Sequence, residues 1–138
     1  MSSCTFFGHR ECWGVDVERI CEVVGALIGE GVDTFYVGNQ GGFDAMVYGC
    51  LKRLRQVHQH IRICVVLAYL PAGECPDAMY PEIEGHPRFA VDRRNRWMID
   101  HAQICVCYIT RTWGGAYKFA QVAKRRGLRM IYLGNDIG

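Results

Sequence analysis

No apolar run in this sequence approaches the roughly 18 residues that a helix needs to cross a membrane. The first ten residues, Met1 to Arg10, also lack the basic segment followed by an apolar core that marks a secretory leader. The composition is that of a soluble globular chain, because 50% of the residues are hydrophobic and 22% are charged. We therefore expect no membrane association and a cytoplasmic location.

An excess of charge of one sign is also absent. The formal net charge is +2 and the pI is about 8.1, so no strong basic field attracts nucleic acid, and we expect no nucleic-acid partner. Lysine is scarce: of the 16 basic residues, 13 are arginine and three are lysine. Because guanidinium groups match the geometry of oxyanions, this choice favours a phosphate-bearing small molecule as the partner.

The Cys-x-x-Cys spacing of redox and metal sites is missing too. The eight cysteines include no Cys-x-x-Cys pair, and Cys64, Cys105 and Cys107 lie within strand-like apolar runs. Both features are typical of reduced core residues, so we expect all eight to be free thiols. The five histidines are scattered along the chain, and we expect no metal site and no bound cofactor.

Proline is confined to one stretch. All four prolines fall between Pro71 and Pro87, which predicts a long loop without helix. Loops of this length inside a compact domain are usually functional. We expect this proline-rich loop to cover a bound ligand.

Elsewhere, helical and strand-like periodicities alternate. Helical spacing predicts helices at about 17–28, 43–57, 92–101 and 116–126, with Asp92 as the N-cap of the third. Apolar runs predict strands ending at Phe7 and at about 34–37, 61–70, 103–109 and 129–133, with a further short strand at 89–91. In 138 residues this alternation predicts a single domain, 1–138. We expect a Rossmann-like three-layer α/β/α fold with a mostly parallel sheet in the order 3-2-1-4-5.

Three of the predicted strands end in a glycine turn that carries polar residues: Gly8-His9-Arg10, Gly38 to Asp44, and Gly114-Gly115. The carboxyl ends of parallel strands meet at one edge of the sheet, where glycine lets backbone N–H groups approach a ligand. Helices are predicted to begin directly after the second and third turns, and helix N-termini attract anions. The pattern predicts a phosphate-binding pocket at this edge.

Four motifs carry a resemblance to a known family: Thr5-Phe6-Phe7-Gly8-His9-Arg10, Gly38-Asn39-Gln40-Gly41-Gly42-Phe43-Asp44, Arg94-Asn95 with Met98, and Gly114-Gly115-Ala116-Tyr117-Lys118. In this order, and over essentially the whole chain, they resemble the YpsA-like branch of the SLOG superfamily. The resemblance implies a Rossmann-like fold that binds a nucleotide or a nucleotide-derived molecule, and by analogy a homodimer. The superfamily includes cytokinin-activating phosphoribohydrolases of the LOG type and the DNA-processing DprA proteins.

One departure from this family concerns catalysis. The related hydrolases carry a glutamate early in the helix after the glycine turn, where this chain has Lys118. A lysine cannot act as a carboxylate nucleophile or stabilise an oxocarbenium-like centre. Asp44 and Glu82 are the candidates to replace the glutamate, although no pattern aims either at a sugar. The sequence favours a binding or sensing module; the alternatives are an N-glycosidic hydrolase or transferase and, more weakly, DprA-like nucleic-acid binding.

The expected ligand-binding residues come from the glycine turns and the matched motifs. They are Gly8, His9, Arg10, Gly38, Asn39, Gly41, Gly42, Asp44, Arg94, Asn95, Gly114, Gly115, Tyr117 and Lys118. Two roles stay open at this stage. Asp44 either caps its helix or accepts hydrogen bonds from ribose hydroxyls. Lys118, in the first turn of a helix, either binds an anion or extends into solvent.

Overall fold

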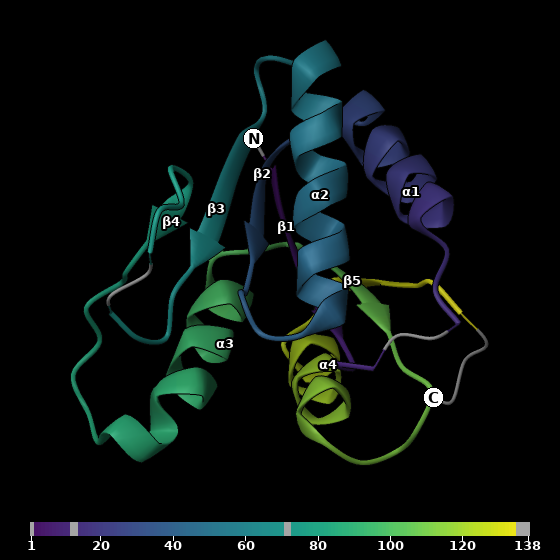
Figure 1. Ribbon diagram of the computed structural model, residues 1–138. Coiled ribbons are helices and arrows are strands. Elements are labelled where there is room, and N and C mark those ends of the chain that lie inside the picture. Colours follow the sequence, from purple (N-terminus) through teal and green to yellow (C-terminus); the bar gives the residue numbers. More distant parts are fainter. Residues whose placement is uncertain (1, 12–13, 71–72, 135–138) are drawn as a thin grey trace.

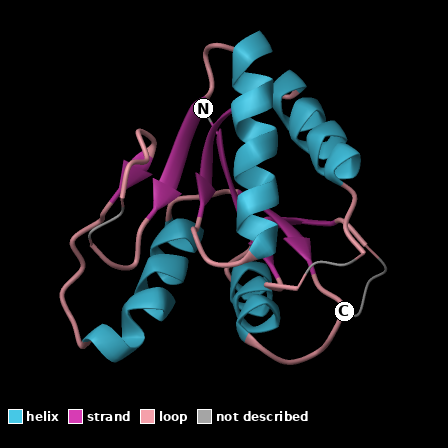
Figure 2. Ribbon diagram, viewed as in Figure 1, coloured by secondary structure: helices cyan, strands magenta, loops and turns pink. Residues whose placement is uncertain are grey.

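The chain folds into a six-stranded sheet with helices on both faces (Figures 1 and 2). The computed structural model describes residues 2–11, 14–70 and 73–134. The strands are β1 (Ser2–Gly8), β2 (Val32–Val37), β3 (Arg62–Val66), β4 (Ala78–Met79), β5 (Ile104–Tyr108) and β6 (Arg129–Tyr132). The helices are α1 (Val17–Gly29), α2 (Gly42–Val57), α3 (Ala90–Asp100) and α4 (Gly115–Arg125), with a short 3-10 turn at Pro87–Phe89 before α3.

Every strand pair in the sheet is parallel, in the order β4-β3-β2-β1-β5-β6. The predicted Rossmann-like fold is confirmed, and the predicted order holds for the five longer strands. β4 adds an edge strand from within the proline-rich loop. β1 lies between β2 and β5, so the order in which the chain adds strands to the sheet reverses at β1. Open α/β sheets bind ligands at this topological switch point.

Alternate side chains of each strand separate the core into two layers. Phe6 of β1 packs on the α1 and α2 side, where its ring stacks 6.3 Å from that of Phe35. The adjacent Phe7 points to the α3 and α4 side, where its ring lies 6.0 Å from that of Phe119. Burial of both faces explains why these strands are continuous apolar runs rather than alternating ones.

The start of α3 differs from the sequence-based expectation. Residues 89–91 form no strand, because a 3-10 turn at Pro87–Phe89 leads into α3 at Ala90. Proline favours the first position of a helical turn, and His86 Nδ1 accepts a hydrogen bond from Arg88 N at 3.0 Å. Asp92 is consequently in the first turn of α3 rather than at its N-cap. The strand expected at 61–70 is also shorter and ends at Val66.

Two expectations extend into residues outside the described ranges. The proline-rich loop begins at Pro71, which lies outside them; its described part, from Gly73 to His86, contains no helix. Cys12 also lies outside them, and the seven cysteines within them form no disulfide. Among the described residues, we find no helix that is both long enough and apolar enough to traverse a bilayer.

Candidate functional site

The three glycine turns meet around one cavity at the carboxyl ends of the strands, toward which the arrowheads of Figure 1 point. This central cavity measures about 290 Å³. It lies between the end of β1, the turns before α2 and α4, and the buried side of α3. Its polar lining comprises Gly8, His9, Arg10, Glu11, Gly38, Gln40, Asp44, Arg94, Asn95, Arg111 and Gly115.

Arg94 is the most deeply buried charge at the cavity, with 3% of its surface exposed. Its Nε donates to Asn95 Oδ1 at 2.8 Å, and its Nη1 donates to Val66 O at 2.9 Å and Asn39 Oδ1 at 3.5 Å. Burial lowers the pKa of Arg94, which the negative charge of Asp44 opposes. No described carboxylate lies within ion-pair distance of its guanidinium. The cavity wall therefore holds a desolvated cation whose neighbours are mostly neutral acceptors, an arrangement that favours an added anion.

Gly38 allows Arg94 and Asp44 to share this wall. A Cβ at Gly38 would lie 2.9 Å from Arg94 Nη1 and 2.9 Å from Asp44 Oδ2. Real Cβ atoms essentially never come so close to another heavy atom. A side chain at position 38 would have to displace the charged end of Arg94 or Asp44, which come from different helices.

Asp44 is not the N-cap residue of α2, one of the two roles considered from the sequence. The N-cap of α2 is Gly41, and Asp44 Oδ2 instead accepts a hydrogen bond from the backbone N of Gln40 at 2.9 Å. Burial raises the pKa of Asp44 to about 6, against the opposing effects of the Gln40 hydrogen bond and the charges of Arg94 and Arg10. The carboxyl group can therefore hold or release a proton near neutral pH.

Helices α2 and α4 begin in the same unusual way. Their N-caps, Gly41 and Gly114, have φ of 92° and 93°, and neither helix has a side-chain cap. By contrast, α1 is capped by Asp16, which accepts from Glu18 N at 2.9 Å. Positive φ favours glycine, and a helix start without a side-chain cap presents backbone N–H groups and a positive dipole end to a ligand.

Backbone contacts fix the first two glycine turns against each other. Gly42 N donates to Arg10 O at 3.1 Å, and a Cβ on Gly41 would lie 2.6 Å from Arg10 Cγ. Gly8 packs directly on the ring of Phe43, since a Cβ there would lie 2.3 Å from Phe43 Cγ. The end of β1 and the start of α2 therefore form one rigid corner of the site.

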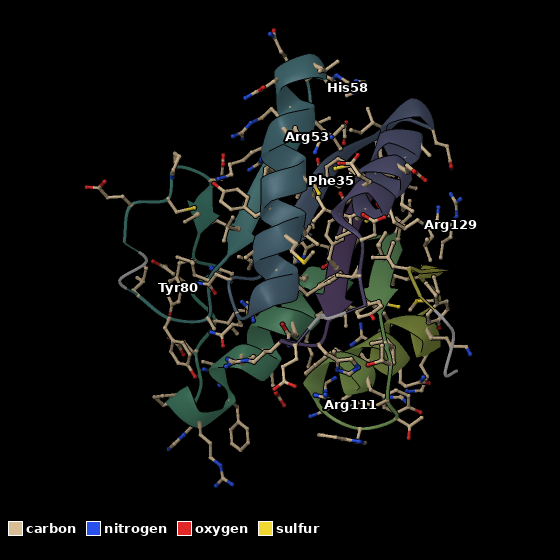
Figure 3. The ribbon with its side chains drawn as sticks, turned by 45° about the vertical axis from the view of Figure 1, so that its right-hand side comes forward. Phe35, Arg53, His58, Tyr80, Arg111 and Arg129 are labelled. Atoms are coloured by element: carbon tan, nitrogen blue, oxygen red, sulfur yellow. The ribbon has the colours of Figure 1, made fainter. Side chains whose placement is uncertain are left out.

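His9 and Arg111 contribute two buried polar atoms, His9 Nε2 and Arg111 Nε, that have no hydrogen-bond partner among the described residues. His9 is 2% exposed, and its pKa is lowered by burial and by the charge of Arg111. The Arg111 guanidinium stacks 4.0 Å from the centre of the Trp113 ring and is labelled in the lower half of Figure 3. Buried polar atoms are rarely left without a partner, so these two point to a ligand at this position.

Lys118 lies away from the central cavity. Its Nζ is 3.0 Å from Asp92 Oδ2, in a half-exposed pair that joins α4 to α3. The anion that a lysine in the first helical turn favours is thus supplied by the protein itself. Tyr117, Gly42 and Gly114 also do not line this cavity, and Asn39 and Gly41 line a neighbouring one of about 220 Å³.

Glu82, the other candidate carboxylate, lines a third and larger cavity of about 690 Å³ next to the described part of the proline-rich loop. Asp44 and Glu82 therefore belong to different cavities. Within the described ranges, no three histidine, cysteine or acidic side chains gather closely enough to hold a metal ion.

Arg111 and Gln40 belong to the site although the sequence did not single them out. Gln40 Oε1 accepts a hydrogen bond from Arg10 Nη2 at 2.7 Å. Its place inside the Gly38 to Asp44 motif was the available signal. Arg111 could have been noted as a basic residue in the turn that leads to Gly114. Comparison with protein-family models and with curated proteins found no match for this chain.

Proposed function

We propose that the protein binds a nucleotide or a nucleotide-derived small molecule in the central cavity and acts as a ligand sensor in the cytoplasm. The observation that carries the proposal is the buried guanidinium of Arg94, which has no described carboxylate within ion-pair distance. It lies beside two helix starts that lack side-chain caps. The resemblance of the four motifs to the YpsA-like branch of the SLOG superfamily supports a nucleotide as the anion.

The lining residues suggest how such a ligand is held. A phosphate fits at the start of α4, where nothing lies within 4 Å of a Cβ built on Gly115 and where Arg111 and the unpartnered Nε2 of His9 are close. Arg10 adds an exposed guanidinium. Ribose hydroxyls would meet Asp44, a hydrogen-bond acceptor when ionised.

A second candidate function, N-glycosidic hydrolysis, is favoured by one observation. Asp44 lines the cavity with a pKa of about 6, and a carboxyl group with such a pKa can serve in acid–base chemistry near neutrality. Lys118 pairs with Asp92 and contributes nothing at this position. We favour binding without catalysis, because the hydrolases in the family we propose use a positioned glutamate that this chain lacks.

The direct test is mass spectrometry of small molecules that copurify with the protein and are released by denaturation. We expect a phosphate-bearing nucleotide derivative. Calorimetric titration of inorganic phosphate and adenosine monophosphate should then give binding that Arg111→Gln weakens by about tenfold or more, since a hydrogen bond to a charged group is lost.

Arg129→Gln is the matched control. Arg129 begins β6 at the opposite edge of the sheet and pairs with Glu30 at 2.6 Å, so its replacement removes the same charge at a distance from the site (Figure 3). If both variants weaken phosphate binding equally, the affinity depends only on the overall charge of the protein and not on Arg111. Absence of any released ligand and of any binding would contradict the proposed function.

A further inference from the structure

A cavity larger than the central one is lined by residues 67–70 and 80–85 with Pro87, Ala90, Arg93 and Arg94, and the phosphate position proposed above does not use it. We call it the outer cavity. It shares Arg94 with the central cavity. Arg94 therefore belongs to the wall of both cavities, which lie next to each other.

Hydrogen bonds hold the walls of the outer cavity in place. Tyr69 donates to Pro87 O at 3.4 Å, and Arg93 Nη1 donates to His86 O at 2.8 Å. Gly85 lies against the Arg93 guanidinium, where a Cβ would come within 2.5 Å of Nη1. At about 690 Å³ the cavity has the size of a small-molecule site.

Aromatic rings form part of this lining. Tyr69 and Tyr80 remain 49% and 39% exposed, which is more than a core role requires. Tyr80 is labelled on the loop at the side of the molecule in Figure 3. Exposed tyrosine rings beside a cavity offer flat faces on which a heteroaromatic ring can stack.

The balance of charged residues differs between the two cavities. Glu82 and Glu84 line the outer cavity, and neither forms an ion pair with a described residue. Arg93 and Arg94 also line the outer cavity and balance these two glutamates, whereas the central cavity has three arginines against Glu11 and Asp44. A ligand that matches both ends is anionic where it meets the arginines and carries hydrogen-bond donors where it meets the glutamates.

We propose that the outer cavity binds the base of the nucleotide and selects a purine that carries an exocyclic amino group. The amino group donates to Glu82 or Glu84, and the ring stacks on Tyr80 or Tyr69. This inference rests on the proposed function, because it takes the phosphate position from the central cavity.

Calorimetric titration with adenosine monophosphate and purine riboside monophosphate tests the selection, since the two differ only in the exocyclic amino group. The wild-type protein should bind adenosine monophosphate about tenfold more tightly, as expected for one charge-assisted hydrogen bond. In the Glu82→Gln/Glu84→Gln variant the two affinities should agree within about threefold, with inorganic phosphate affinity unchanged. Tyr80→Ala should weaken both nucleotides and leave phosphate binding intact.

Glu74→Gln is the control, because Glu74 is an exposed glutamate of the same loop that does not line the outer cavity. It should retain the tenfold preference. Equal affinity of the wild-type protein for both nucleotides, with binding still weakened by Arg111→Gln, would overturn base selection and leave the proposed function standing. Failure of phosphate and both nucleotides to bind would overturn both.

Discussion

Asp44 and Arg94 face each other across Gly38 without forming an ion pair. Each carries a pKa displaced by burial toward its neutral form, upward for the carboxyl group and downward for the guanidinium. Both shifts indicate that this part of the wall holds charge at a cost to stability. A bound anion beside Arg94 would reduce the cost that arises from the guanidinium.

Asp44 should make the folded protein less stable as the pH rises. Its pKa is raised from 3.8 to about 6, so between these values the folded chain binds more protons than the unfolded chain. The free energy of unfolding then falls with rising pH, by at most about 3 kcal/mol for this group at 1.36 kcal/mol per unit. In Asp44→Asn this fall is absent, so the variant should gain stability relative to wild type from pH 4 to pH 8. Urea unfolding at pH 4 and pH 8 measures the free energy of unfolding of both proteins. The same pH dependence in wild type and Asp44→Asn would refute the raised pKa of Asp44.

Gly38→Ala should destabilise the fold and weaken ligand binding. The new methyl group would lie 2.9 Å from both Arg94 Nη1 and Asp44 Oδ2, and overpacking of this kind costs about 1–3 kcal/mol. Gly49→Ala is the matched control, because Gly49 lies within α2 with open space at its Cβ position. That substitution should stabilise the protein by roughly 0.5–1 kcal/mol. Chemical denaturation measures the free energy of unfolding of both variants. Equal changes would show that Arg94 and Asp44 can move aside for a methyl group at position 38.

Gly115→Asp should abolish phosphate and nucleotide binding without unfolding the protein. Nothing lies within 4 Å of a Cβ at Gly115, so the side chain fits, and an acidic residue in the first turn of α4 stabilises a helix by about 0.3–1 kcal/mol. The same carboxylate would repel a phosphate at the helix start. Calorimetry and a thermal melt on one sample measure both properties. Wild-type affinity in a folded variant would place the ligand elsewhere.

We expect no appreciable N-glycosidic cleavage of common ribonucleotides or deoxyribonucleotides. Lys118 is paired with Asp92, and loss of a positioned acid, base or nucleophile typically removes several orders of magnitude in rate. Chromatography of free base after long incubation with a nucleotide panel is the measurement. Cleavage that persists in homogeneous protein and disappears in Asp44→Asn would instead establish the hydrolase and identify its carboxylate.

The sequence could predict the glycine turns and the parallel sheet because both depend on local patterns. Strand ends, helix starts and their glycines lie within a few residues of one another, as at Gly41 and Gly114. The pairing of Lys118 with Asp92 could not be predicted, since the two residues are 26 positions apart on different helices. β4 has only two residues, too few for any periodicity, and the 3-10 turn at Pro87–Phe89 depends on a cap by His86. The outer cavity likewise depends on how a long loop packs against α3.

The position of β1 between β2 and β5 makes the central cavity a property of the whole sheet. Its lining extends from Phe6 near the start of the chain to Ala116, so no contiguous half of the chain can assemble it. A ligand that requires this cavity binds only the folded state and raises its stability by about 2.7 kcal/mol at a concentration of 100 times Kd. Ligand-dependent protection against hydrogen exchange should therefore reach buried amides on every central strand, including those far from the bound molecule.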